Sequence, residues 1–175
     1  MRELLGQIVG FAAAALIMLS FQCKTEKRLY IFQLVGGLTF VLHYILLFEY
    51  SGAVMNTLSW VRCLLLLTDS KYTRSKYTML ALVAIAVGLG IWSYVGILSL
   101  FPVIAQVVST VFLYTKDQKK IKISQFCCTS PCWMIYNIGV FSVSGIICEA
   151  FNMISVVVYF LRERHKRAVG GKNVL

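Results

Sequence analysis

Charged residues are scarce in this chain of 175 residues: they make up 14% of it, and only seven are acidic. Proline occurs only twice, so a loop-rich or collagen-like chain is excluded. Soluble domains are about 25% charged and about 45–50% apolar, whereas 59% of this chain is apolar and its mean hydropathy is +0.78. A soluble fold of this length cannot hide that much apolar surface. The composition predicts an integral membrane protein.

Enzyme motifs are also missing. Gly36 and Gly37 lie inside an apolar run without the Lys-Ser/Thr pair that holds phosphate in a nucleotide-binding loop. The only histidines are His43 and His165, and they do not form a set of nucleophile, base and acid with other residues. We therefore expect no enzyme activity and no cofactor.

The six cysteines lie inside apolar segments or at their ends, where a free cysteine acts as a small apolar residue. Polar loops with the paired spacing of a zinc site or a disulfide framework are absent. Helix packing is therefore the favoured role, and no metal site is expected. A metal or redox role stays open for one cluster: Cys127, Cys128 and Cys132.

The net charge of +10 raises the question of nucleic acid, but the basic residues lie between apolar runs and not on one face. No platform of aromatic and basic residues lies outside the apolar segments. Membrane topology explains the charge better, and we expect no nucleic-acid partner.

Hydropathy predicts seven spans of roughly 17–20 residues, each long enough to cross the bilayer. Backbone groups in lipid must be paired within the chain, so each span is expected to be an α-helix. No cleavage site follows the first span, which indicates an anchored helix and not a signal peptide. The spans lie near residues 4–22, 29–48, 52–68, 77–94, 97–115, 123–140 and 143–161.

Lysine and arginine are distributed very unevenly between these spans. Fifteen of the seventeen lie in one set of connections and in the C-terminal tail, whereas Arg2 is alone on the other side and Arg62 lies within a span. Because basic residues favour the cytoplasmic side, we expect the N-terminus outside and the C-terminus in the cytoplasm. The expected location is the bacterial inner membrane, with several passes.

A shift of 93 residues aligns spans one to three with spans five to seven. It places Ser51-Gly52 on Ser144-Gly145 and Phe48 on Phe141. Three spans are an odd number, so a linker span is needed to keep two such units parallel. The predicted fold is an all-α membrane protein of two parallel three-helix repeats, at 1–68 and 96–161, with a loop and linker helix at 69–95 and a basic tail at 162–175. In such transporters the substrate site lies where the repeats meet.

A set of residues spread over nearly the whole chain carries a family resemblance: Gly10, Ser20-Phe21-Gln22, the loop from Lys24 to Arg28, Phe32-Gln33, His43-Tyr44, Gly52, Asn56, Arg62, Trp133, Tyr136-Asn137, Gly145, Glu149 and Arg162. In these residues the chain resembles the YgjV family of bacterial inner-membrane proteins. That family is similar at fold level to the SWEET sugar facilitators and the wider MtN3/PQ-loop group, which implies alternating access without ATP or a cofactor. The group also contains receptors, so the fold does not fix the function.

The SWEET resemblance implies a proline hinge in each of the first two helices of a repeat. Pro102 and Pro131 fill these places in the second repeat, and the first repeat has no proline. Gly36-Gly37 lies near the position equivalent to Pro131 and is the candidate for flexibility there. Pro102 and Pro131 are therefore candidate gating residues.

Polar side chains within the spans are candidates for a solute site, because they usually face the bundle interior or a cavity. SWEET-like proteins place an asparagine from each third helix at the substrate site, and Asn56 and Asn152 resemble these in position. On span five, Gln106 lies on one stripe with Pro102. Ordinary hydrogen bonding between helices is the alternative for these residues.

Span six carries an aromatic face beside an amide. Trp133, Tyr136 and Asn137 offer the flat apolar surface and the hydrogen-bonding groups that a sugar or nucleoside ring needs. Their counterparts in the first repeat include Phe40 and His43. Simple helix packing is the alternative reading of both sets.

Arg62 and Glu149 are the charged residues that lie well inside spans. Their depths differ by roughly 10 Å on the rise of an α-helix, so a direct salt bridge is not expected. Arg62 extends to the cytoplasmic interface or forms a gate contact, or else binds a substrate anion. Glu149 is a candidate for proton coupling, the alternative being an exposed carboxylate at the outer mouth.

These residues predict a facilitator of a small polar metabolite, sugar-like by resemblance, that works by alternating access between the repeats. The alternative is a membrane receptor or assembly factor that acts through its cytoplasmic tail. The expected partners are the lipid bilayer and a small polar solute, and a homo-oligomer is left open.

Overall fold

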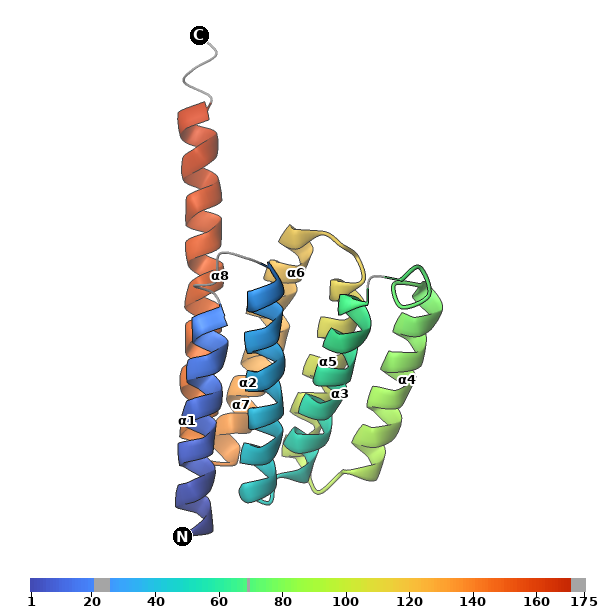
Figure 1. Ribbon diagram of the computed structural model, residues 1–175, viewed down its shortest axis with the longest axis vertical. Coiled ribbons are helices and arrows are strands. Elements are labelled where there is room, and N and C mark those ends of the chain that lie inside the picture. Colours follow the sequence, from blue (N-terminus) through green and yellow to red (C-terminus); the bar gives the residue numbers. More distant parts are fainter. Residues whose placement is uncertain (21–25, 69, 171–175) are drawn as a thin grey trace.

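The computed structural model describes residues 1–20, 26–68 and 70–170 (Figure 1). Its described part is all-helical, which confirms the predicted class. Lys24 in the predicted basic loop and residues 171–175 of the predicted tail lie outside the described residues. The elements are α1 Arg2–Ser20, α2 Glu26–Leu46, α3 Tyr50–Leu67, α4 Lys76–Trp92, η1 Ile97–Ser99, α5 Leu100–Leu113, α6 Gln118–Ser124, η2 Gln125–Thr129, α7 Ser130–Gly139 and α8 Val143–Gly170. Since α6, η2 and α7 are continuous, these elements form seven helical rods.

Six of the rods form a closed ring. α1, α2 and α3 pack side by side in chain order, as do α5, α7 and α8. The ring closes where α8 packs against α1 and where α3 packs against α5. α4 lies outside the ring at the edge of the bundle, against α3 and α5 (Figure 1).

The bundle has an apolar exterior and a polar interior. Large apolar side chains are exposed on most helices, Ile31, Leu42 and Ile154 among them. Soluble proteins rarely expose large continuous apolar patches, whereas a bilayer favours them. Among the described residues, buried polar side chains are about as numerous as buried apolar ones: Ser20, His43, Ser51, Ser93, Ser99, Gln106, Thr110, Ser124, Thr129, Ser130, Asn137, Ser142 and Ser144.

Within residues 1–20, 26–68 and 70–170, length and apolar composition alone mark two helices as long enough to cross a membrane. These are Arg2–Ser20 and Val143–His165. Three further apolar stretches are shorter: Ile31–Leu46, Lys76–Trp92 and Ile97–Leu113.

The turns that lead into α3 and α8 have the same geometry. Each contains a phenylalanine in the left-handed region, Phe48 with a φ of 63° and Phe141 with a φ of 54°. The next residue in each turn, Glu49 or Ser142, donates its backbone N–H over 2.9 Å to the carbonyl five residues earlier. Positive φ is uncommon for a residue with a side chain. Its recurrence at a separation of 93 residues therefore matches the shift found in the sequence.

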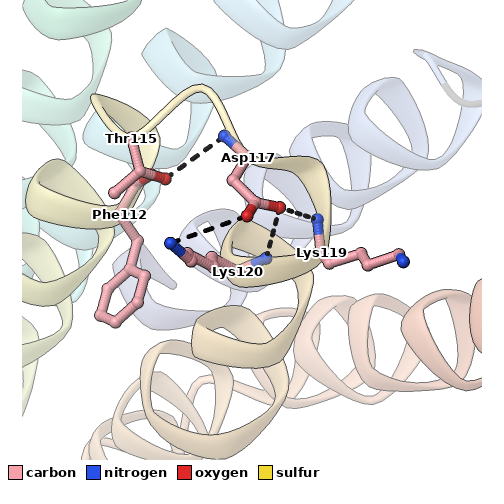
Figure 2. Close-up of polar contacts among 5 residues, drawn as sticks. All are labelled: Phe112, Thr115, Asp117, Lys119 and Lys120. Carbon is pink, nitrogen blue, oxygen red and sulfur yellow. Dashed lines mark hydrogen bonds and ion pairs between the residues drawn. The ribbon is translucent and has the colours of Figure 1, made fainter.

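Helix α6 begins earlier than the predicted start at residue 123, because Asp117 caps it (Figure 2). Asp117 Oδ1 accepts hydrogen bonds from the backbone nitrogens of Lys119, at 3.0 Å, and Lys120, at 3.3 Å. The Lys120 ammonium lies 3.8 Å from the other carboxylate oxygen. Thr115 Oγ1 accepts from the backbone N–H of Asp117 over 3.3 Å and holds the loop. Asp is a preferred residue at this position.

The structure differs from the predicted spans in two further places, in the sixth and in the seventh helical segment. The sixth span was expected to be a plain α-helix, but residues 125–129 are π-helical. Pro131 follows this segment and has no N–H to donate to the previous turn, so the hydrogen-bond ladder shifts there. Helix α8 continues to Gly170, past the predicted end at residue 161. Lysine and arginine are good helix formers, so the basic sequence does not end the helix.

Candidate functional site

Tyr44 and Asn137 lie near the C-terminal ends of α2 and α7 and meet inside the bundle. The Tyr44 hydroxyl donates to Asn137 Oδ1 over 2.7 Å, and the two residues are 2% and 1% exposed. They are 93 residues apart, which is the shift found in the sequence. This bond joins the first three helices of the ring to the last three.

A pair of reciprocal hydrogen bonds flanks this contact. His43 Nε2 lies 2.7 Å from Ser142 Oγ, and the Tyr136 hydroxyl donates to Glu49 Oε2 over 3.2 Å. The shift of 93 residues converts His43 into Tyr136 and Glu49 into Ser142. The second bond is thus the first with the two halves exchanged, as in a two-fold interface.

Glycines bring the backbones close at the same place. The Gly52 N–H donates to the Tyr136 hydroxyl over 2.9 Å. A Cβ at Gly52 would lie 2.8 Å from Tyr136 Cε1 and 2.9 Å from Tyr44 Cδ1, so no side chain fits there. A Cβ at Gly145, its equivalent, would collide with the amide of Asn137.

We call this group of side chains the latch. It lies at the end of the bundle that holds the turns before α3 and α8, which is also the end of the N-terminus (Figure 1). Its members are His43, Tyr44, Glu49, Tyr136, Asn137 and Ser142.

Aromatic rings extend the latch into the bundle. Phe40 stacks on Tyr44 with a centroid distance of 6.2 Å, and Trp133 stacks on its ring at 6.0 Å. Phe40 and Trp133 are 93 residues apart and so flank the Tyr44 ring from the two halves. The structure thus brings together five of the predicted substrate-binding residues: Phe40, His43, Trp133, Tyr136 and Asn137.

Glu149 lies within a chain of hydrogen-bond donors between α8 and the π-helical segment. The Ser130 hydroxyl donates to Glu149 Oε2 over 2.6 Å, and Gln125 Nε2 donates to Ser130 over 2.8 Å. Asn152 Nδ2 lies 3.4 Å from the same carboxylate oxygen. Glu149 is therefore a hydrogen-bonded group inside the bundle and not an exposed carboxylate at its mouth.

Asn56 and Asn152, the two predicted substrate-site asparagines, bond within their own helices. Asn56 Nδ2 donates to the carbonyl oxygen of Gly52 over 3.1 Å, and Asn152 bonds Glu149 on α8. The structure does not join them to the aromatic rings of the latch.

Arg62 and Gln106 lie in a separate polar interface between α3 and α5. Ser59 donates from its hydroxyl to Gln106 Oε1 over 2.5 Å. A guanidinium nitrogen of Arg62 donates to the hydroxyls of Ser109 and Thr110, each at 2.8 Å. Arg62 thus bonds to α5 and not to Glu149, in line with the depths expected from the sequence. Pro102 is buried in the first turn of α5, where a helix tolerates proline without a kink.

Two apolar grooves run along the outside of the bundle beside α4. The larger, of about 470 Å³, lies between α2, α3 and α4 and includes Val41, Ala53 and Leu89. The smaller, of about 280 Å³, lies between α4 and α5 and includes Gly90 and Val103. None of the predicted substrate-binding residues lines these two grooves. The predicted site residues instead pack against one another inside the bundle.

The turn before α3 adds a titratable group to the latch. Partial burial raises the pKa of the Glu49 carboxyl above its usual value, and the hydrogen bond from Tyr136 opposes this rise.

Within the described part of the chain, no group of three metal-binding side chains comes together.

Sequence reasoning missed Glu49, Ser142 and Ser130 as partners of the site residues. A signal existed for the first two, because the 93-residue shift aligns Glu49 with Ser142 in the repeated turns. Ser130 gave no such signal, since serine is also a common packing residue between membrane helices. Ser59 lies at helical spacing from Asn56 in the sequence, but its partner Gln106 was not predicted.

An all-helical bundle with an apolar exterior, a polar interior and two membrane-length helices defines the class of helical membrane proteins. The chain belongs to one family of this class: the family model Imp-YgjV, described as "Bacterial inner membrane protein", matches residues 4–167. The protein is therefore a bacterial inner-membrane protein. No curated protein and no solved structure gives a significant match to the chain.

Proposed function

We propose that this protein moves a small polar solute across the bacterial inner membrane by alternating access between two three-helix repeats. The repeats are α1 to α3 and α5 to α8, and α4 is the linker between them. The observation that carries the proposal is the set of reciprocal bonds around the Tyr44–Asn137 contact. Two repeats that meet through equivalent residues can move apart and together at this contact, and transporters with parallel repeats bind substrate at such an interface.

The hydrogen bonds of the latch support the proposal that the solute path is closed at one end in this structure. Its bonds connect the ends of α2 and α7, and the excess of basic residues at the other end of the bundle favours an orientation with the latch on the outer side. Opening then requires the Tyr44–Asn137, His43–Ser142 and Tyr136–Glu49 bonds to break together. Phe40 and Trp133, just inside the latch, offer flat apolar surfaces to a sugar-like ring.

Uptake into proteoliposomes tests this proposal. Sugars, nucleosides, vitamins and amino acids are supplied as separate radiolabelled solutes. We expect one class to be taken up, and we expect Trp133→Ala or Asn152→Ala to abolish that uptake. Trp92→Ala is the matched control, because Trp92 is 77% exposed on α4. Equal uptake by Trp133→Ala and the control would remove Trp133 from the path, and no uptake of any solute by the wild type would contradict the proposal.

Glu149 is proposed to couple transport to a proton. Ser130 and Asn152 bond the Glu149 carboxylate, and Gln125 bonds Ser130. All three side chains are uncharged. An ionisable residue inside a membrane bundle commonly marks a proton or ion pathway. Glu149→Gln is expected to keep solute exchange but to lose acceleration by an inward proton gradient. Unchanged acceleration in this variant would exclude the coupling.

A second function is favoured by the shape of α8, which extends well past the other helices (Figure 1). Arg162 and Arg164 are exposed on this extension. A receptor or assembly factor would use such a basic helix to bind a cytoplasmic partner. Deleting the residues after His165 separates the two functions: transport should persist, whereas a partner-binding protein would lose its function while still inserting in the membrane.

A further inference from the structure

Two buried nitrogen donors in the α3–α5 interface have no hydrogen-bond partner within the protein. They are Nε of Arg62 and Nε2 of Gln106, and Gln106 is only 1% exposed. A buried donor without an acceptor is costly, and native structures rarely contain one without a reason. Two of them on one interface indicate a missing acceptor.

The neighbouring oxygens are already engaged. Gln106 Oε1 accepts from the Ser59 hydroxyl. The hydroxyls of Ser109 and Thr110 accept from Arg62 and donate to the Gln106 backbone carbonyl, over 3.1 Å and 2.7 Å. The hydrogen-bond partners of the guanidinium on α5 are therefore neutral hydroxyls, and they leave its positive charge uncompensated.

The two donors lie on matching turns of adjacent helices. Ser59 and Arg62 are one turn apart on α3, as are Gln106 and Ser109 on α5. One turn of an α-helix rises about 5.4 Å. Both nitrogens are closed to solvent, so a small acceptor reaches them when α3 and α5 move slightly apart, and on adjacent turns one acceptor can then approach both.

From this arrangement we infer that the α3–α5 interface is a binding site for a small anion, held by Arg62 and Gln106. A halide, a carboxylate or a phosphate group supplies the missing acceptor and compensates the guanidinium charge. The anion is either a free inorganic ion or the charged end of the transported solute. Only the second source rests on the proposed transport function.

The thermal unfolding midpoint of the purified full-length protein in detergent tests the site. Sodium chloride, bromide, acetate and phosphate are titrated separately at equal ionic strength, and the same titrations of Arg62→Gln give the effect of ionic strength alone. An anion that binds the folded state raises the midpoint in a saturable way. We expect at least one small anion to do so in the wild type.

Gln106→Glu is the decisive variant, because it places a carboxylate of the protein opposite Arg62. We expect this variant to have a higher midpoint than the wild type without added salt and no specific response to the small anions. Lys76→Gln is the matched control: it removes an exposed positive charge at the start of α4 and should respond as the wild type does. Arg62→Gln is expected to lose the specific response without the gain in the midpoint before salt is added.

Each remaining outcome decides against the site or identifies the source of the anion. A wild type that responds to every small anion no more than Arg62→Gln does would overturn the inference, and would show that the Gln106 amide meets its partners within the protein. A full anion response in Gln106→Glu would place the binding elsewhere. A shift with chloride, bromide or phosphate assigns the site to inorganic ions, and a shift only with acetate assigns it to the carboxylate end of a solute. Since none of these readings needs flux, failure here is distinct from failure of the transport proposal.

Discussion

The ring of six helices closes through two interfaces that differ in the size of the residues they carry. Where α1 meets α8, Gly10 lies against the Ser144 side chain, and Ala13 is buried one turn further along α1. Where α3 meets α5, the position of Ala13 is taken by Gln106, and Arg62 reaches across. Ala13 and Gln106 are both fully buried, at 0% and 1% exposure. The same place in the fold is thus filled by a methyl group on one side and by an amide on the other.

This difference indicates which interface moves. Small residues allow close approach of two helix backbones, and the packing that results is lost when the helices separate. Hydroxyls, an amide and a guanidinium can instead exchange their partners for water or a solute. We therefore expect α1–α8 to act as the fixed side of the ring and α3–α5 as the side that opens.

The largest effect is expected from filling the small interface. In Gly10→Val, the new Cβ would collide with the Ser144 hydroxyl and would lie 2.5 Å from His43 Nδ1. Overpacking of this kind costs about 3 kcal/mol. We expect loss of most folded protein from the membrane and a much lower unfolding midpoint. Gly88→Val is the control, because no atom lies within 4 Å of a Cβ there; equal losses in both variants would contradict the close packing of α1 against α8.

A variant in the latch tests the contact between the first three and the last three helices of the ring. Tyr136→Phe removes the hydroxyl that accepts from the Gly52 N–H and donates to Glu49. A buried N–H is left without its acceptor, so a loss of about 1–3 kcal/mol in stability is expected. Chemical unfolding in detergent measures it. Tyr159→Phe, at the other end of the bundle on α8, should change stability little, and a loss of the same size there would show that the latch has no special role.

Removing the charge from the polar interface should cost little. Arg62→Met deletes a guanidinium whose charge is not compensated by the protein, and an apolar side chain of similar length is often tolerated in place of a buried ion. We expect a change within about 1 kcal/mol, measured without added salt, together with loss of the anion response. A destabilisation as large as that of Gly10→Val would contradict the distinction between the two interfaces.

The smallest effect concerns the pH dependence of stability. Because burial raises the Glu49 pKa in the folded protein, the folded state holds this proton more tightly than the unfolded state. Stability therefore falls as the pH rises through the raised pKa. Unfolding midpoints between about pH 4 and about pH 7 should show this slope. Glu49→Gln should flatten it, and an equal slope in the variant would assign the dependence to other groups.

Much of the helical layout follows from the sequence because apolar runs and basic loops report directly on helices in a membrane. The recurrence of Phe48 and Phe141 in identical turns follows from the aligned Ser-Gly pairs, which the 93-residue shift already matched. The π-helical segment could not be predicted. Pro131 indicates where the backbone hydrogen bonds of the helix are interrupted, but it does not indicate which helical form replaces the α-helix there. The length of α8 was underestimated because hydropathy locates only the part of a helix that lies in the membrane. The backbone hydrogen bonds of the helix continue beyond the membrane surface.

The candidate site was predicted in part. The aromatic face of span six and its counterparts Phe40 and His43 do come together. Asn56 and Asn152 were grouped only because of their positions along their helices. Such a position does not determine the hydrogen-bond partner of the side-chain amide. Asn56 bonds its own backbone, and Asn152 bonds Glu149. Contacts between distant helices, such as that of Arg62 with Thr110, depend on packing that one sequence does not reveal.

The most direct test of the central claim, two repeats held together by the latch, is a distance measurement across it. Spin labels replace Phe48 and Phe141, the exposed residues in the equivalent turns, after the six native cysteines have been substituted. Pulsed electron resonance in nanodiscs then compares this protein with the same protein carrying Tyr44→Phe and Tyr136→Phe. The account predicts one short distance in the first and an added longer distance in the second, because the latch no longer holds the turns together. Identical distance distributions in the two proteins would contradict it.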